Sequence, residues 1–400
     1  MSSQIADLLE GAGQGHWILP LPDEPNPVAL ARAVAFICGA PQRVSDLVAD
    51  RFRSLIGDPE HLVFVIADGF GMNFVDNLDQ NSFSRSNLAL ESRAVFPTST
   101  GPNLFTYGRA LWPGQHGSIG WYVHLPELGE RVTLFPWTRT RDGKSLSDLG
   151  ISGEQVYPGT PEVRRFERDS VNFIPSLFSG SVATRALHGA ETIVGYEGLD
   201  SAVDLVVERV AAASAPTYSH IFWPEVDRAA HEFGTDHPNT LREVEYLDSE
   251  LGRLSRSLPE SARIVLTADH GHLNFGDGQK FIVERTDPLR LMLIDEPSGD
   301  ERSLFFHVIE GRDNSFATEF EQRFGDHFVL FATGDLLETK LLGPDGISVF
   351  TTPRLGSFTA IARNDAGMKF LAHESDSEIT LVSQHGGLSP EEMLVPVIIA

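Results

Sequence analysis

Cysteine is almost absent from this chain of 400 residues, in which Cys38 is the only one. A single thiol cannot form an internal disulfide, so a disulfide-stapled scaffold is excluded and a reducing compartment is expected. Cys38 follows Ala-Phe-Ile, which predicts a buried, small apolar side chain. The first residues, MSSQIADLLEGAGQGH, lack the basic start and apolar run of a secretory signal. We therefore expect a cytoplasmic protein.

Long apolar runs and positive charge are also scarce. No segment reaches the ~18 consecutive apolar residues of a membrane-spanning helix, so we expect no membrane partner. Lys and Arg number 31 against 56 Asp and Glu, which gives a formal net charge of −25. This negative potential disfavours binding to duplex nucleic acid. A small phosphorylated substrate stays open, because bound divalent ions would reverse the sign of the charge locally.

The residues that are present suit a soluble globular protein with a large core, since 41% are hydrophobic and 22% are charged. Residues 61–67 form an unbroken apolar run, and residues 218–223 and 263–268 are similar. Such runs are typical of strands covered on both faces, as in a parallel sheet. Helical patterns at 202–213 and 238–258 alternate with them. The alternation predicts a doubly wound α/β fold, with helices on both faces of a mostly parallel sheet.

Four segments are predicted along the chain. Residues 1–60 are interpreted as an N-terminal extension packed on the core, and residues 61–273 as the main core. Residues 274–378 mix short β-like runs with one helical pattern. This mixture fits a smaller inserted or capping α+β subdomain and an elaborated part of the main domain equally well. Residues 379–400 are expected to return to the core.

Two of the predicted strands end in an aspartate that Gly or His follows at once, in Asp68-Gly69 and Asp269-His270. Ligand sites of open α/β sheets lie outside the carboxyl ends of the strands. Asp68 and Asp269 are therefore expected to meet, although they are far apart in the sequence. Either aspartate alone is better explained as a turn or helix-capping residue. The pair, with His270 attached, favours a binding site.

Asp227 and His231 stand four residues apart. If this segment begins a helix, both side chains lie on one face within reach of a common ion. A single D-x-x-x-H pattern is nevertheless common by chance. The mixture of carboxylates and imidazoles suits Zn²⁺, with Mn²⁺ and Fe²⁺ as alternatives, whereas Ca²⁺ prefers oxygen ligands alone.

Five blocks of the sequence stand out as a set: ADGFG at 67–71, FPTSTGPN at 96–103, EVDRAAH at 225–231, ADHGH at 268–272 and QHGGLSPEEMLVP at 384–396. In this order they resemble the alkaline phosphatase superfamily. The nearest branch is that of the nucleotide pyrophosphatase/phosphodiesterases (type I phosphodiesterases), with features of the PglZ-type hydrolases. The similarity covers roughly residues 61–125, 218–275 and 379–400. Each motif is moderately specific, and five in the right order are strong.

The resemblance implies a hydrolase of phosphodiester or pyrophosphate bonds with two divalent metal ions. One ion would be held by Asp227, His231 and His385. The other would be held by Asp68, Asp269 and His270, with the hydroxyl of Thr100 bound to it.

Thr100 is the nucleophile that the resemblance implies, through a phosphoryl-threonine intermediate. A threonine hydroxyl is a poor nucleophile at neutral pH, and metal coordination is one way of activating it. Two ions about 3.5–4 Å apart can hold the attacking and leaving oxygens of an in-line displacement at phosphorus. The alternative is that Thr100 is an ordinary helix N-cap.

Substrate contacts follow the family pattern less closely. The family's phosphodiesterases place a phosphate-binding Asn at the position of Trp121, whose indole N–H could donate instead or whose ring could simply pack. Asn103 and Tyr122 are further candidates for substrate binding. The residue after the nucleophile, often an aromatic that stacks on a nucleobase, is Gly101, so no nucleotide preference is implied. His272 could orient a metal ligand, although a satisfied loop histidine is the favoured interpretation.

Three other functions are alternatives to a phosphodiesterase. A phosphomonoesterase or phosphonate hydrolase would use the same site but needs a cation for the extra charge of a monoester, and Arg109 is the only one between Thr100 and Tyr122 that qualifies. A catalytically inactive binding or regulatory module would have lost metal ligands, and none is missing. A mutase of the superfamily normally uses serine and has a larger insertion. We therefore predict a phosphodiesterase acting on a small phosphorylated substrate, with nucleotides among the candidates and the oligomeric state open.

Overall fold

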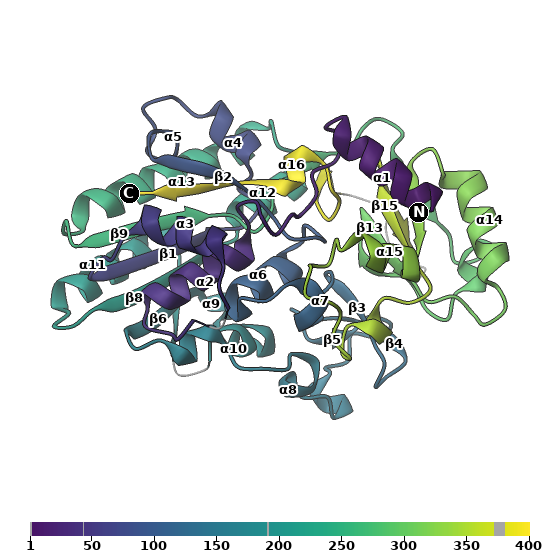
Figure 1. The fold of residues 1–400 in the computed structure, drawn as a ribbon, viewed down its shortest axis with the longest axis horizontal. Coiled ribbons are helices and arrows are strands. Elements are labelled where there is room, and N and C mark those ends of the chain that lie inside the picture. Colours follow the sequence, from purple (N-terminus) through teal and green to yellow (C-terminus); the bar gives the residue numbers. More distant parts are fainter. Residues whose placement is uncertain (1, 43, 190–191, 372–380) are drawn as a thin grey trace.

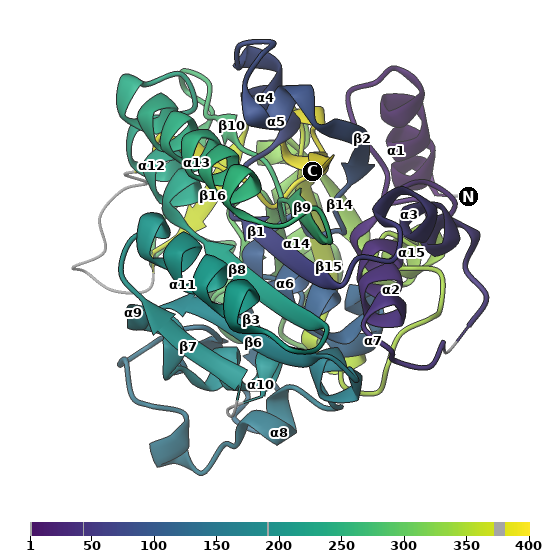
Figure 2. The ribbon, with the colours of Figure 1, turned by 90° about the vertical axis from the view of Figure 1, so that its left-hand side faces the viewer.

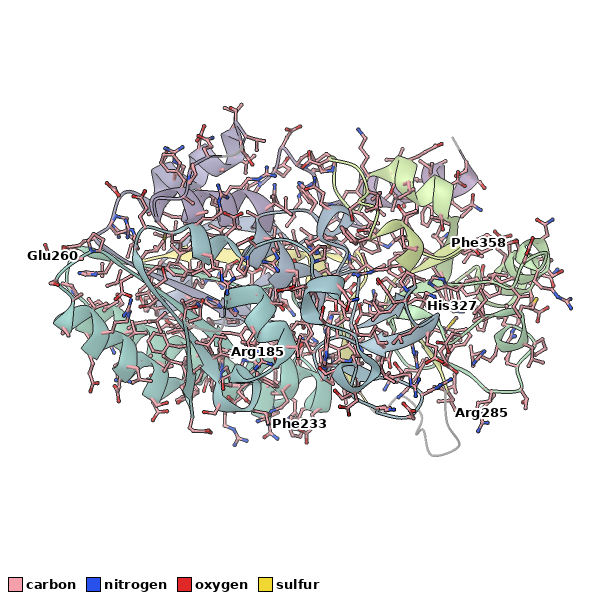
Figure 3. All side chains as sticks on the ribbon, turned by 90° about the horizontal axis from the view of Figure 1, so that it is seen from below. Arg185, Phe233, Glu260, Arg285, His327 and Phe358 are labelled. Carbon is pink, nitrogen blue, oxygen red and sulfur yellow. The ribbon has the colours of Figure 1, made fainter. Side chains whose placement is uncertain are left out.

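Two seven-stranded sheets lie next to each other along the long axis of the molecule (Figure 1). The computed structural model describes residues 2–42, 44–189, 192–371 and 381–400. The predicted boundary between residues 378 and 379 lies outside the described residues. In the view of Figure 3, side chains fill the space between the elements from Glu260 at one end to the region of His327 and Phe358 toward the other.

The first sheet is mostly parallel. Its strands are, in spatial order, β2 (Leu88–Arg93), β18 (Leu394–Ile399), β9 (Ala262–Thr267), β1 (His61–Ala67), β8 (Thr217–Trp223), β6 (Asp169–Pro175) and β7 (Ile193–Tyr196). Neighbouring strands from β9 to β7 pair in parallel, and β18 runs antiparallel to both of its neighbours. The three predicted apolar strands are β1, β8 and β9, at the centre of the sheet.

Helices cover both faces of this sheet (Figure 2). One face packs on α2 (Pro27–Ile37), α3 (Leu47–Ile56) and α6 (Thr100–Arg109), and the other on α11 (Leu199–Ala212), α12 (Glu225–Phe233) and α13 (Pro238–Ser257). Residues of β1 alternate between the faces, Leu62 and Phe64 toward the first group and Val63 and Val65 toward the second. Since apolar side chains cover both faces of the sheet at β1, apolar residues do not alternate with polar ones along this strand. The predicted doubly wound α/β fold is confirmed.

The second sheet is antiparallel and combines strands from two distant stretches. Its order is β14 (Phe328–Ala332), β15 (Phe358–Ala362), β13 (Ser303–Phe306), β12 (Ser298–Asp300), β3 (Tyr122–Leu125), β4 (Glu130–Thr133) and β5 (Thr138–Arg139). α14 (Asp313–Phe324) covers one face with a cluster of phenylalanines, and α1 (Ser3–Gly13) and α15 (Thr333–Thr339) cover the other. The sheet thus takes strands from both predicted segments, 61–273 and 274–378. The division of the chain into domains stays a prediction.

Two short strand pairs complete the structure: β10 (Leu273–Asn274) with β17 (Ser383–Gln384), and β11 (Lys280–Val283) with β16 (Gly367–Phe370). The first pair brings the segment before His385 beside the segment after His270. The remaining helices are α4 (Met72–Asn77), α5 (Phe83–Ser86), α7 (Pro113–His116), η1 (Ser147–Leu149), α8 (Gly153–Val156), η2 (Glu162–Arg165), α9 (Ser176–Ser179), α10 (Val182–His188), η4 (Arg290–Met292), η5 (Thr352–Arg354) and α16 (Pro390–Met393). None of the described helices combines the length and apolar character needed to cross a membrane.

Packing of α13 on the first sheet gives a stability prediction. Leu251 is fully buried in the core beneath α13, whereas Leu241 on the same helix is 36% exposed. Leu251→Ala is expected to lower the free energy of unfolding by about 2–5 kcal/mol, because it leaves a cavity. The control, Leu241→Ala, is expected to change it by about 0.5 kcal/mol at most. Urea unfolding measures both, and equal losses would contradict the packing described.

Candidate metal and nucleophile site

Asp68 and Asp269 meet at the carboxyl ends of the neighbouring strands β1 and β9. The Gly69 backbone N–H donates a hydrogen bond to Asp269 Oδ1 at 3.1 Å, which ties the turn after β1 to the turn after β9. The Asp68 N–H donates to the Trp223 carbonyl of β8 at 2.8 Å. The parallel sheet therefore places the two aspartates together, as the strand ends in the sequence indicate.

A buried cluster forms around these aspartates. His270 Nε2 lies 3.4 Å from Asp68 Oδ1 and 3.4 Å from Asp269 Oδ2. Thr100, the first residue of α6, places its Oγ1 atom 3.3 Å from His270 Nε2 and 3.5 Å from Asp68 Oδ1. Asp269 Oδ2 is buried and makes no hydrogen bond within the described part of the chain. The predicted nucleophile thus faces three side chains that could hold one metal ion.

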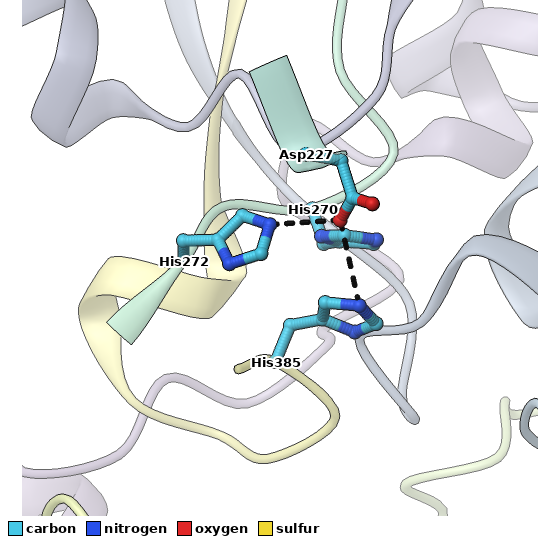
Figure 4. Close-up of side chains that lie close together, drawn as sticks. All are labelled: Asp227, His270, His272 and His385. Atoms are coloured by element: carbon cyan, nitrogen blue, oxygen red, sulfur yellow. Dashed lines mark hydrogen bonds and ion pairs between the residues drawn. The ribbon is translucent and has the colours of Figure 1, made fainter. Parts of the chain in front are cut away.

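A second cluster surrounds Asp227, in the first turn of α12. Asp227 Oδ1 lies 3.3 Å from His231 Nε2, 3.6 Å from His385 Nε2 and 2.8 Å from His272 Nε2. Figure 4 shows Asp227 among His270, His272 and His385, and the ligand atoms of these four residues all lie within 4.8 Å of one another. The rings of His270 and His385 stack with centroids 3.7 Å apart, so the two clusters adjoin.

Backbone carbonyls set the tautomers of three histidines. Nδ1 of His231, His270 and His385 lies 2.9, 3.1 and 2.9 Å from the carbonyl oxygens of Ser383, Gly271 and Thr98, respectively. A carbonyl only accepts, so each Nδ1 carries the proton and a neutral ring presents a bare lone pair at Nε2. Each Nε2 faces a carboxylate oxygen, to which a protonated ring donates and beside which a neutral ring can bind a metal. Metal-ligating histidines have this arrangement, with Nδ1–H held by a carbonyl.

The distances between these atoms fit a tetrahedral ion. Ligands about 2.0–2.1 Å from a tetrahedral ion lie about 3.3 Å from one another. The pairs formed by His231 and His385 with Asp227, and by His270 with Asp68, are 3.3–3.6 Å apart. Asp269 Oδ2 is buried without a hydrogen bond among the described residues, and a bound cation would compensate its charge. The side chains present therefore fit a divalent metal.

His272 contacts Asp227 in a different way. Its Nε2 lies 2.8 Å from Asp227 Oδ1, which is a hydrogen-bond distance, and its Nδ1 lies 3.0 Å from the Ser383 hydroxyl. We infer that His272 holds the Asp227 carboxylate in place. His272 is thus a hydrogen-bonded loop histidine, as the favoured interpretation has it, and its contact with Asp227 supports the alternative that it orients a metal ligand. The only signal in the sequence was its place two residues after His270.

Crowding of charge shifts the pKa values of this site. Burial and the charges of Asp269 and Asp227 raise the pKa of Asp68 well above its usual value. Burial acts in the same direction on Asp227, but the neighbouring His231 and His272 hold the pKa of Asp227 well below its usual range. Burial lowers the pKa of His231, and the Asp227 charge outweighs it and raises that pKa to about 9. The cluster of carboxylates thus favours positive charge at its centre.

All six predicted metal ligands converge with Thr100, but Asn103 does not face a substrate. Asn103 is fully buried, its amide group donates to the Ser99 carbonyl at 3.1 Å, and its Oδ1 accepts from the Val95 N–H at 3.0 Å. It therefore holds the turn before α6. The predicted substrate contact of Asn103 was wrong, because a side chain three residues into a helix can turn back onto the preceding turn.

Trp121 and Tyr122 lie at the start of the second sheet. Trp121 is half-buried and stacks on Phe135, with ring centroids 5.6 Å apart and an interplanar angle of 12°. Tyr122 is also half-buried, and the Arg131 guanidinium lies 4.5 Å from its ring centroid. Whether either binds substrate stays a prediction. The contact between Phe135 and Trp121 was not predicted, since no motif of the sequence points to Phe135.

Comparison with known proteins places this geometry in context. Residues 62–298, more than half of the chain, match the family described as type I phosphodiesterase / nucleotide pyrophosphatase. Venom phosphodiesterase 2 of Crotalus adamanteus and venom phosphodiesterase CdcPDE of Crotalus durissus collilineatus are each 24% identical over 225 residues. These matches cover 52% of this chain and 26% of each relative, so the chain spans about a quarter of their length.

Solved structures show the same fold. Murine ectonucleotide pyrophosphatase / phosphodiesterase 5 is 18% identical with a TM-score of 0.61, and its human counterpart is 16% identical with a TM-score of 0.63. Each alignment covers 84% of this chain and 87% of the other. One of the murine structures is that of an inactive threonine-to-alanine variant in complex with AMP.

The raised pKa of Asp68 predicts how pH and metal affect stability. The folded state holds the Asp68 proton more tightly than the unfolded state does. The contribution of this proton to the free energy of unfolding is therefore complete below the pKa that Asp68 has in the unfolded chain, and it is lost as the pH rises through the raised pKa of the folded state. At pH 8 in EDTA, Asp68→Asn is therefore expected to melt several degrees above the wild type. Zn²⁺ or Mn²⁺ is expected to reverse the order, because the ion binds the carboxylate.

Thermal unfolding with and without metal checks this prediction. The control is Asp58→Asn, whose side chain is 97% exposed in the wild type and which is expected to behave as the wild type throughout. Equal stabilisation of wild type and Asp68→Asn by metal would contradict the assignment of Asp68.

Proposed function

This chain belongs to the type I phosphodiesterase / nucleotide pyrophosphatase family, and from that premise we propose that it is a metal-dependent hydrolase of phosphodiester or pyrophosphate bonds. The predicted branch is thereby confirmed, and the PglZ-like features stay a prediction. One observation carries the proposal: the Thr100 hydroxyl lies within 3.5 Å of the buried Asp68 and His270 side chains at the start of α6.

Two divalent ions, Zn²⁺ with Mn²⁺ or Fe²⁺ as alternatives, would occupy the two clusters. The ligands of one would be Asp68, Asp269, His270 and the Thr100 hydroxyl, and those of the other Asp227, His231 and His385. When bound, such ions neutralise phosphate charge and lower the pKa of the hydroxyl. The carbonyl-held histidines and the unpaired Asp269 Oδ2 support this assignment.

The Thr100 hydroxyl would lose its proton and attack phosphorus through Oγ1, while the bond from phosphorus to the leaving alcohol or phosphate breaks and that group departs, taking up a proton where it is an alcohol. Water would then break the bond between Oγ1 and phosphorus, which releases the remaining phosphate monoester and restores the hydroxyl. Ser99, the N-cap of α6, makes no side-chain cap within the described part of the chain. The N–H groups of the first helical turn therefore stay available to phosphate oxygens. Pro102 has no N–H to leave unsatisfied. The helix dipole favours the same placement of negative charge.

A diester is the substrate class that we propose over a monoester. Arg109, the cation considered for the extra charge of a monoester, is the last residue of α6 and is buried. At 1.5 Å per residue it lies about 13 Å along the helix from Thr100. Its guanidinium is 3.5 Å from the Tyr157 carbonyl. Arg109 therefore does not serve a phosphate at Thr100.

An aromatic pair beside the nucleophile supports a nucleotide among the substrates. A Cβ at Gly101 would lie 3.5 Å from the Phe135 ring and 3.1 Å from the Gly120 carbonyl, so Phe135 and its stacking partner Trp121 approach the nucleophile closely. Flat half-buried rings suit stacking on a nucleobase. The AMP complex of the murine relative fits this proposal.

The proposal predicts activity on bis-p-nitrophenyl phosphate that exceeds activity on p-nitrophenyl phosphate in the metal-loaded protein. Thr100→Ala is expected to lower kcat by about 10³-fold or more, since it removes the nucleophile. Thr100→Ser keeps a hydroxyl and serves as the control, with measurable turnover expected. Steady-state kinetics on both substrates decide the matter. Undiminished turnover by Thr100→Ala would contradict the role of Thr100 as nucleophile. Faster hydrolysis of the monoester than of the diester would contradict the proposed substrate class.

A further inference from the structure

Three consecutive residues of the second sheet contact segments of the candidate site, which lies at the strand ends of the first sheet. β12 and β13 pair so that Asp300 stands opposite Ser303, which leaves Glu301 and Arg302 as a two-residue turn. We call residues 300–302 the clamp turn. Each of its side chains contacts a segment that carries or adjoins a site residue.

Asp300 joins the two segments on either side of the nucleophile. Its Oδ1 atom accepts hydrogen bonds from the Ser99 hydroxyl at 3.1 Å and from the Trp121 backbone N–H at 3.2 Å. Ser99 directly precedes Thr100. Asp300 Oδ2 makes no hydrogen bond among the described residues. One oxygen atom therefore connects the start of α6 to the segment that leads into β3.

Close packing leaves Asp300 little freedom. Asp300 is 9% exposed, and a Cβ at Gly386 would lie 2.9 Å from the Asp300 Cβ. A Cβ at Gly120 would lie 3.1 Å from Asp300 Oδ2. Both glycines also have positive φ angles, +116° at Gly386 and +155° at Gly120. Backbone on two sides thus confines the Asp300 carboxylate.

Arg302 and Glu301 contact a different part of the site, the segment that carries His385. Arg302 is fully buried, and its Nε and Nη2 atoms donate to the two carboxylate oxygens of Glu392 at 2.7 and 2.9 Å. Glu392 also accepts from the backbone N–H groups of Gly387 at 2.7 Å and Ser389 at 3.1 Å. Glu301 accepts from the side-chain amide of Gln384, the residue before His385, at 3.3 Å.

The two sides are also joined directly. His385 Nδ1–H donates to the Thr98 carbonyl at 2.9 Å, and the Thr98 hydroxyl donates to the Gly387 carbonyl at 2.8 Å and accepts from the Gly386 N–H at 3.0 Å. The segment before Thr100 and the segment after His385 therefore form one hydrogen-bonded unit. The clamp turn holds this unit from both ends.

We propose that Asp300 and Arg302 are positioning residues, which set the Thr100 hydroxyl and the His385 imidazole in the geometry that catalysis requires. The inference rests on the proposed function. A bidentate Arg–carboxylate pair is strong and directional, so it fixes the Gly387–Ser389 backbone rather than merely neutralising charge. Asp300 acts on Thr100 through the hydroxyl of the preceding Ser99. The two residues should therefore affect different steps.

Asp300→Ala and Asp300→Asn test the nucleophile side. Loss of both hydrogen bonds in Asp300→Ala is expected to lower kcat for bis-p-nitrophenyl phosphate by about 10–100-fold, because small misplacement of a reacting group is costly. KM and bound metal should stay within about twofold, since the Asp and His side chains that would hold the ions stay in place. Asp300→Asn keeps an acceptor oxygen at this position and should recover most of kcat. Wild-type kcat in Asp300→Ala, or an equal loss in Asp300→Asn, would overturn the role of Asp300.

Arg302→Lys and Glu392→Gln test the metal side. Both break the bidentate pair while keeping polar side chains, and each is expected to weaken Zn²⁺ binding by about 10–100-fold, as removal of groups that orient a metal ligand does. Titration of the metal-free, folded proteins against a chromophoric chelator gives the affinity. Arg354→Lys changes another buried arginine, which binds the Gly117 and Val156 carbonyls, and should keep wild-type affinity. Wild-type affinity in Arg302→Lys and Glu392→Gln, or an equal loss in Arg354→Lys, would overturn the role of Arg302.

Metal titration needs no turnover, so it separates this inference from the proposed function. A wild type that binds Zn²⁺ but hydrolyses no diester would sink the proposed function alone, and the titrations would still decide the role of Arg302. Active wild type with unchanged Asp300→Ala and Arg302→Lys would sink the clamp turn alone.

Discussion

Three closely spaced carboxylates that repel one another are the constraint on which the rest of this site depends. Asp68 and Asp269 are buried and follow neighbouring parallel strands, and the half-buried Asp227 lies in the first turn of α12, so the fold forces the three together. Removal of such charges from water is costly unless positive charge compensates them. The histidines are arranged accordingly, with Nδ1 held by a carbonyl and Nε2 turned toward the carboxylates. The arrangement therefore favours cations, and Thr100, the proposed nucleophile, stands at its edge.

The site also depends on both sheets. The first sheet supplies the carboxylates and the start of α6. Strand β3 of the second sheet begins directly after Trp121. The β12–β13 turn of the same sheet contacts the segments on both sides of Thr100 and the segment that carries His385. A buried Arg302–Glu392 pair gives little net stability compared with apolar packing, but it specifies one arrangement of the Gly387–Ser389 backbone. Precision in the site thus depends on contacts between parts of the chain that are far apart in sequence.

Prediction from sequence succeeded where a single physical requirement controls the local pattern. β1, β8 and β9 lie at the centre of the sheet with both faces covered, so their sequences are largely apolar and that of β1 is an unbroken run. β6 and β2 were missed, because they contain exposed polar residues such as Asp169 and Glu91 and carry no such run. The long-range pairing that joins β3 to β12 leaves no mark on either strand.

The sequence by itself determined the fold class and indicated that the predicted metal ligands lie together with Thr100, because aspartates at parallel strand ends must share one edge of a sheet and the motifs occur in the family's order. Only the tertiary structure decided where the side chains of Asn103, Arg109, His272 and Asp300 lie and what they contact. Asn103 turns back onto the preceding turn, Arg109 lies at the far end of α6, and His272 and Asp300 contact residues distant in sequence. Spacing along a chain specifies which residues share an element, but side-chain direction and contacts across elements depend on how the elements pack.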